Sequence, residues 1–219
     1  MEMAEAFPGW WTVVGAHMVA LYAWEAGLSP RPSNDVDVLV NVRLAANGTE
    51  EISRYLRARD YDPEISRNGL AHLFKRGTAQ IDVLAPDGLG ARAKITTVPP
   101  NRTVRVPGGT QALSRSRPIE VRSRDVEGLV PRPSLLGAIL IKIRAISVDD
   151  LPDAQRADVA LLLRLVQDPD ELAREISRAE RGWLRSHVYF ADPADDHWDA
   201  FETDDREQSA LVYRRLLAG

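Results

Sequence analysis

The chain has 219 residues, carries a formal net charge of −4 and contains no cysteine, which excludes disulfide bonds and thiolate metal sites. Its 44% hydrophobic and 27% charged residues are ordinary proportions for a globular protein. No apolar run reaches the roughly 18–20 residues of a membrane span. Residues 1–6 carry two glutamates and lack the basic start of a secretory signal. We therefore expect a cytoplasmic protein with no membrane partner.

The first half of the chain has the patterns of short strands. We predict strands over residues 11–14, 35–41, 70–75 and 80–84, with short β-like pieces at 102–106 and 119–121. A helix over His17–Ala26 follows the first strand and ends at Gly27. Thr49 is the predicted N-cap of a second helix that runs to Arg59.

After Pro131-Arg-Pro133 the spacing of apolar residues becomes helical. Ser134 is the predicted N-cap of a helix over residues 135–147, and further helices are expected over 154–166, 169–185 and 205–217. Strands in the first half and helices in the second indicate an α+β chain. We expect a small mixed β-sheet domain over residues 1–130, followed by a C-terminal helical bundle over residues 131–219.

Three aspartates stand out because each lies in an apolar strand pattern. Asp35 and Asp37 are two residues apart in Asp35-Val-Asp-Val-Leu-Val40, so their side chains leave the same face of a strand. Asp82 lies in Gln80-Ile-Asp-Val-Leu84, where an acidic residue is costly to bury unless something pairs with it. Three carboxylates from neighbouring strands suit two Mg²⁺ ions. Asp82 is also a candidate base for an attacking hydroxyl.

Two nearby segments suit a phosphate group. Gly15-Ala16 stands where the first strand becomes a helix, and a bare backbone there lets phosphate approach the amides of the helix N-terminus. Arg31 and Ser33 directly precede the two aspartates and are candidate contacts for a triphosphate. The four histidines show no metal-ligand spacing, and we expect them to be structural or exposed.

The chain resembles the nucleotidyltransferase superfamily that includes DNA polymerase beta. Three features carry the resemblance: a glycine turn, the motif Arg31-x-Ser33-x-Asp35-hydrophobic-Asp37, and a later lone aspartate. Within it, the chain is most similar to bacterial minimal and toxin-type nucleotidyltransferases of the AbiEii and MenT kind, over residues 13–165. The resemblance implies that Asp35 and Asp37 bind metal and that Asp82 is the third catalytic carboxylate. It also implies that Gly15 cradles phosphate.

The same group often carries Lys-x-x-Ala on one helix and an aspartate in the next, and Lys142-Ile-Arg-Ala145 and Asp158 stand in those places. By resemblance, Lys142 reaches the donor triphosphate, and Asp158 orients Lys142 or the nucleotide. The chain departs from the pattern at Ala16, where glycine or serine is usual, and at Gln155, where an acidic residue is common. These departures predict altered donor choice or reduced activity.

The expected function is Mg²⁺-dependent transfer of an NMP from an NTP, such as ATP, to an acceptor hydroxyl. We favour an RNA acceptor, the tRNA 3′ end, as in the toxin-type relatives, with a cognate antitoxin as a further expected partner. The basic segment Arg92–Arg124 indicates a polyanion-facing surface. The acidic segment Asp192–Glu207 instead favours a cationic small molecule such as an aminoglycoside, and a protein acceptor is a further alternative. A non-catalytic nucleotide-sensing or partner-binding module is the alternative that Ala16 and Gln155 favour.

Overall fold

The computed structural model describes residues 2–123, 126–150, 152–199 and 201–219. This part of the chain is a mixed α+β structure with a small mixed sheet and nine α-helices. The strands are β1 (Trp11–Val14), β2 (Asp35–Val40), β3 (Asp62–Pro63), β4 (Leu73–Arg76), β5 (Ala79–Pro86), β6 (Thr96–Val98), β7 (Asn101–Arg102), β8 (Arg105–Val106), β9 (Ser116–Ser123) and β10 (Val126–Pro133). The helices are α1 (Glu2–Ala6), α2 (Gly15–Glu25), α3 (Gly48–Arg57), α4 (Gly109–Ser114), α5 (Leu135–Ile146), α6 (Asp153–Arg164), α7 (Pro169–Glu175), α8 (Arg178–Arg185) and α9 (Thr203–Ala218), with 3-10 turns η1 (Val188–Ala191) and η2 (Asp196–Trp198).

The main sheet has the order β1-β2-β5-β4-β3, with β8 pairing the far end of β5. β2 and β5 run parallel, whereas β1–β2, β4–β5 and β3–β4 are antiparallel. The second halves of β2 and β5 are apolar and almost fully buried, as expected for central strands covered on both faces. Their first halves carry the polar side chains, so the polar residues of both strands meet at one end of the sheet.

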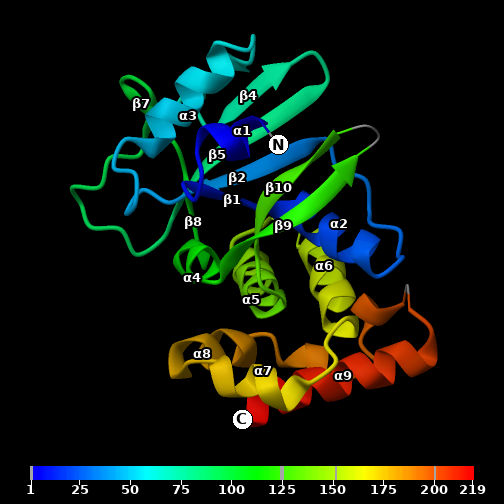
Figure 1. Ribbon diagram of the computed structural model, residues 1–219. Coiled ribbons are helices and arrows are strands. Elements are labelled where there is room, and N and C mark those ends of the chain that lie inside the picture. The colour runs from blue at the N-terminus through cyan, green and yellow to red at the C-terminus, as the bar shows by residue number, and fades with distance from the viewer. Residues whose placement is uncertain (1, 124–125, 151, 200) are drawn as a thin grey trace.

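The helices of the second half of the chain form two levels beneath the sheet (Figure 1). α5 and α6 lie next to the sheet, and α7, α8 and α9 lie farther from it. α5 has apolar residues on all sides, which is typical of a helix with no solvent-facing side. α5 and α6 pack against each other and both contact α2, so the second half of the chain closes over the first.

The hairpin of β9 and β10 is more extensive than the sequence predicts. Only residues 119–121 have a strand pattern, yet β9 and β10 pair over eight residues each. The prolines and arginines of this segment obscure the alternation of apolar residues. β10 packs beside β1, where Thr12 Oγ1 donates to the Pro131 carbonyl at 3.1 Å. The expected domain boundary between residues 130 and 131 falls within β10.

Two predictions of helix ends are wrong. The predicted helix over residues 169–185 is two helices, because Ser177 starts α8 with a capping box. The Ser177 hydroxyl accepts from the Glu180 N–H at 3.3 Å, and the Glu180 carboxylate accepts from the Ser177 N–H at 2.8 Å. Thr49 does not cap α3, since Asn47 occupies the N-cap position and the Thr49 hydroxyl donates to the Thr96 carbonyl instead.

Other local predictions are confirmed. β1 has the predicted bounds, and Gly27 follows α2 with a φ of +70° in the left-handed region that favours glycine. Ser134 is the N-cap of α5 and accepts from the Gly137 N–H. Among the helices of the described residues, none combines the length and the apolar character that crossing a membrane requires.

The capping box at Ser177 gives a test of the α7–α8 break. We expect Ser177→Ala to lower the free energy of unfolding by about 1 kcal/mol, because the Glu180 N–H at the start of α8 loses its acceptor. Urea unfolding measures this change. Ser186→Ala, at the exposed C-cap of the same helix, is the matched control and should have a smaller effect. Equal effects of the two variants would contradict a specific role for the capping box.

Candidate active site

Three carboxylates converge at the polar end of β2 and β5. Asp35 and Asp37 project from β2, and Asp82 stands directly opposite Asp37 in the parallel register of β5. One carboxylate oxygen from each residue lies within 4.8 Å of the others. The three aspartates could therefore hold a metal ion, and the predicted convergence of their side chains is confirmed.

Gly15 leaves space for the Asp37 carboxylate at the junction of β1 and α2. Gly15 has a φ of +64°, and a Cβ atom at this position would lie only 1.7 Å from Asp37 Oδ2. A side chain at Gly15 would thus require both a strained backbone and a displaced carboxylate. This gives Gly15 a structural role in the site in addition to the predicted contact with phosphate. Ala16, the next residue, is buried, and its predicted role stays a prediction.

The three carboxylates of this cluster repel one another when they are ionised, and nearby cations partly offset that repulsion. The pKa of Asp37 is raised to about 7, mainly by burial and also by the neighbouring charges of Asp82 and Asp35, while Lys142 and Arg31 act in the opposite direction. Burial also raises the pKa of Asp82. Carboxyl groups with raised pKa values at one point are destabilised as anions, and a bound cation would relieve this.

The hydrogen bonds at the site leave one acceptor unsatisfied. Ser33 Oγ donates to Asp35 Oδ1 at 2.5 Å, and His17 Nδ1 lies 2.8 Å from the Asp35 carbonyl oxygen. Asp82 Oδ1 is buried and has no hydrogen-bond partner within the described part of the chain. A buried carboxylate oxygen without a donor is costly. The three carboxylates therefore fit a hard divalent cation, whose ligands are oxygens.

Asp158 joins two of the predicted nucleotide-binding cations. Arg31 Nε and Nη2 lie 2.9 and 3.0 Å from the two Asp158 oxygens, which is a bidentate geometry. Lys142 Nζ lies 2.7 Å from Asp158 Oδ2. The side chains of Lys142 and Asp158 are 4% and 3% exposed, whereas that of Arg31 is 35% exposed. Arg31 is therefore the cation of this group that is open to a ligand.

Lys142 is held on a second side by Gln155. Gln155 Oε1 accepts from Lys142 Nζ at 2.8 Å, and Gln155 Nε2 donates to Asp149 Oδ2 at 2.9 Å. Gln155 stands where the nucleotidyltransferases that the chain resembles commonly have an acidic residue. Lys142 thus has a neutral partner in addition to Asp158. The resemblance implies that Asp158 orients either Lys142 or the nucleotide. The structure shows a direct contact of Asp158 with Lys142. Contact of Lys142 with a triphosphate stays a prediction.

A pocket of about 440 Å³ adjoins the ion pair of Arg31 and Asp158. Leu28, Leu161 and Phe201 give it apolar walls, and Glu202 contributes a carboxylate. Phe201 and Glu202 belong to the acidic segment Asp192–Glu207, but no motif in the sequence links this segment to Arg31. The pocket extends the site from Arg31 toward the start of α9.

The basic segment over residues 92–124 is only partly available to a polyanion. Arg115 Nη1 lies 2.7 Å from Glu180 Oε1, and Arg122 pairs with Glu127 at 2.5 Å. Exposed basic side chains without an ion-pair partner among the described residues remain at Arg92, Lys94, Arg102, Arg105 and Arg117. Arg124 lies outside the described residues. The expectation of an RNA-facing surface therefore rests on fewer charges than the sequence suggests.

The chain matches no protein-family model, no curated protein and no solved structure. The resemblance to nucleotidyltransferases thus depends on the residues named above and on their arrangement in space.

The close approach of Gly15 and Asp37 can be tested by substitution. We expect Gly15→Ala to destabilise the protein more than Gly77→Ala, although both replace a glycine with positive φ. Alanine in this conformation costs about 1–2 kcal/mol at either position, but only at Gly15 does the added Cβ meet another atom within 4 Å. Thermal unfolding with and without MgCl₂ should show that Gly15→Ala also loses stabilisation by the ion. Equal behaviour of the two variants would contradict the packing argument.

The raised pKa of Asp37 predicts a pH dependence of stability. In the folded protein Asp37 keeps its proton up to about pH 7, whereas the unfolded chain releases it near the usual 3.8. The folded state therefore binds more protons in this range, and the free energy of unfolding falls as pH rises, by up to about 1.4 kcal/mol per pH unit. Above about pH 7, Asp37 is ionised in both the folded and the unfolded state, so the free energy of unfolding falls no further from this group.

Urea unfolding in EDTA at about pH 5 and pH 8 measures this effect. Asp37→Asn should be less pH-dependent than the unmodified protein, and Asp62→Asn, at an exposed position, should not differ from it. Mg²⁺ should restore stability at the higher pH only in proteins that retain Asp37. An unchanged pH dependence in Asp37→Asn would refute the raised pKa.

Proposed function

We propose that the protein is a Mg²⁺-dependent nucleotidyltransferase that moves an NMP from an NTP to an acceptor hydroxyl and releases pyrophosphate. The observation that carries the proposal is the convergence of Asp35, Asp37 and Asp82 beside a glycine that begins a helix. Its sheet half would then be a nucleotidyltransferase domain, and its second half the accompanying helical bundle. A cofactor pair of Mg²⁺ ions would be held by the three aspartates and would neutralise triphosphate charge.

The protein groups have distinct roles in this reaction. The acceptor oxygen attacks the α-phosphorus, the bond to pyrophosphate breaks, and the hydroxyl proton passes to Asp82. Burial raises the pKa of Asp82, which favours this proton uptake. Arg31, fixed by Asp158, would bind the triphosphate and align it with the attacking oxygen. The first amides of α2, after Gly15, would bind a phosphate oxygen.

RNA, with the tRNA 3′ end foremost, is the acceptor that we propose. The exposed arginines and lysine over residues 92–117 support this choice, because phosphate contacts come mainly from such side chains. A cognate antitoxin is an expectation from the same resemblance. If these side chains bind RNA, affinity should fall steeply with salt.

Transfer of label tests the proposal directly. The protein is incubated with Mg²⁺, bulk tRNA and each of the four α-labelled NTPs in turn. We expect label on RNA, and a loss of at least about 100-fold in Asp35→Asn, because this variant removes a carboxylate that would stabilise the transition state through the ion. Asp62→Asn removes an exposed carboxylate elsewhere and should retain full activity.

The other outcomes are also decisive. Unlabelled RNA with nucleotide still bound would contradict an RNA acceptor and favour a small molecule or a protein. Absence of nucleotide binding in calorimetry would contradict the proposal itself and favour a non-catalytic partner-binding module. Label that persists in Asp35→Asn would refute the role of the carboxylates.

A further inference from the structure

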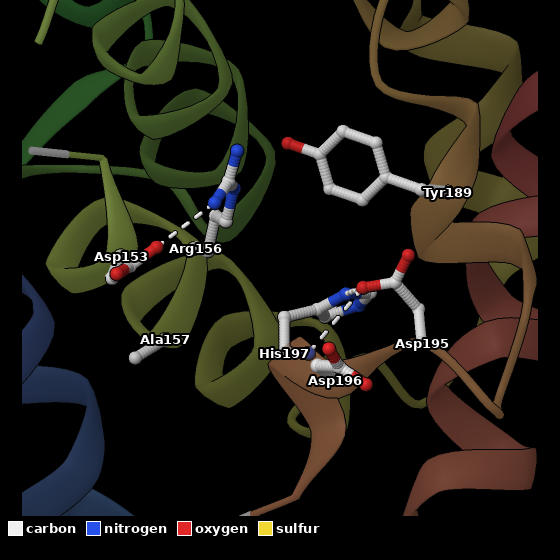
Figure 2. A pocket seen from close by; sticks show the side chains of 7 residues that line it. All are labelled: Asp153, Arg156, Ala157, Tyr189, Asp195, Asp196 and His197. Carbon is white, nitrogen blue, oxygen red and sulfur yellow. Dashed lines mark hydrogen bonds and ion pairs between the residues drawn. The ribbon is translucent and has the colours of Figure 1, made fainter.

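A second pocket lies on α6, on the side facing the segment between α8 and α9. It has a volume of about 550 Å³ and is lined by Asp153, Arg156, Tyr189, Asp195, Asp196 and His197. Figure 2 shows these side chains facing one another across a space between α6 and the segment that carries η1 and η2. None of them belongs to the proposed nucleotidyltransferase site.

His197 presents an unsatisfied acceptor at this pocket. Its side chain is only 3% exposed, and its Nδ1 lies 2.6 Å from Asp195 Oδ1. A carboxylate accepts hydrogen bonds, so Nδ1 carries the proton and Nε2 is left with a lone pair. Burial lowers the pKa of His197, which keeps the ring neutral. Nε2 is buried and has no hydrogen-bond partner in the described part of the chain.

The pocket has more negative than positive charge. Three carboxylates face a single guanidinium, and Arg156 Nη1 is already 2.8 Å from Asp153 Oδ1. Asp196 is exposed and makes no ion pair with a described residue. Asp195 is bonded to a neutral imidazole and therefore keeps its negative charge. Two buried ring or guanidinium nitrogens of the pocket have no hydrogen-bond partner in the described part of the chain, the donor Arg156 Nε and the acceptor His197 Nε2. The unmatched charge is that of the Asp195 and Asp196 carboxylates, which accept hydrogen bonds from a cation, as does His197 Nε2.

We propose that this pocket binds a small organic cation that carries primary ammonium groups. An ammonium group supplies the positive charge that Asp195 and Asp196 lack and the N–H donors that these carboxylates and His197 Nε2 accept. The volume lies in the range of small-molecule sites. Asp35, Asp37 and Asp82 are the one group of three metal ligands in the described residues, so an organic cation fits this second pocket better than a metal ion.

The pocket adjoins the proposed nucleotide site but does not depend on it. Ala157 lines both this pocket and the one beside Arg31 and Asp158. The proposal concerns binding alone, and it holds whether or not the protein transfers nucleotides.

Isothermal titration calorimetry with the full chain and putrescine tests the proposal. We expect one binding site, with affinity weakened at least about 10-fold by Asp195→Asn and by Asp196→Asn, because each removes a charged hydrogen-bond acceptor. Asp204→Asn is the matched control, since it removes an exposed carboxylate of the same acidic segment outside this pocket. It should change the affinity less than twofold. Unfolding temperatures of all three variants establish that they are folded.

A second measurement identifies the hydrogen-bond donors. The bis-trimethylammonium analogue of putrescine has the same charge and chain but no N–H groups, and it should bind at least about 10-fold more weakly. In nitrogen NMR spectra, the Nε2 resonance of His197 should shift as putrescine saturates the site. No binding of putrescine would overturn the proposal. Equal binding of the analogue, or equal weakening by Asp204→Asn, would show diffuse charge attraction and would overturn it as well.

Discussion

The contact between the Asp37 carboxylate and the bare backbone of Gly15 is the constraint on which the rest of the site depends. It fixes where β1 must turn into α2, since no other residue type leaves room for the carboxylate. The parallel register of β2 and β5 then places Asp82 opposite Asp37, and the alternation along β2 adds Asp35. A one-residue slip of β5 would move Asp82 to the other face of the sheet.

Without a bound cation, the convergence of three carboxylates destabilises the folded protein. Packing elsewhere in the structure must offset this loss of stability. The carboxylates repel one another, yet the apolar second halves of β2 and β5 are buried against helices. The same strands therefore supply both the stabilising core and the destabilising site. Lys142 and Arg31 bring opposite charge close enough to affect Asp37. Asp158 pairs with both cations and so connects the loop before β2 to α5 and α6.

The parts of the site that the sequence could predict are those set by local geometry. The period of two along a strand is enough to place Asp35 and Asp37 on one face, and strand neighbours are enough to bring Asp82 to them. The contact of Arg31 with Asp158 spans 127 residues, and no local rule encodes it. The same holds for Glu180, which both caps α8 and pairs with Arg115. The sequence predicts only residues 119–121 of the β9–β10 hairpin, for a different reason: prolines in its strands hide the alternation on which strand prediction relies.

The two groups of acidic residues differ in the chemistry they can support, although both lack enough positive charge. Asp35, Asp37 and Asp82 offer only carboxylate oxygens that point together from a rigid sheet, which suits a compact divalent ion. Asp195 and Asp196 lie beside a neutral imidazole and an aromatic wall in a wider space, where directional N–H donors match the acceptors better. Within the acidic segment Asp192–Glu207, His197 Nε2 is a buried acceptor that the composition of the segment does not reveal. Charge counts locate such regions, but the geometry of the acceptors decides which cation fits them.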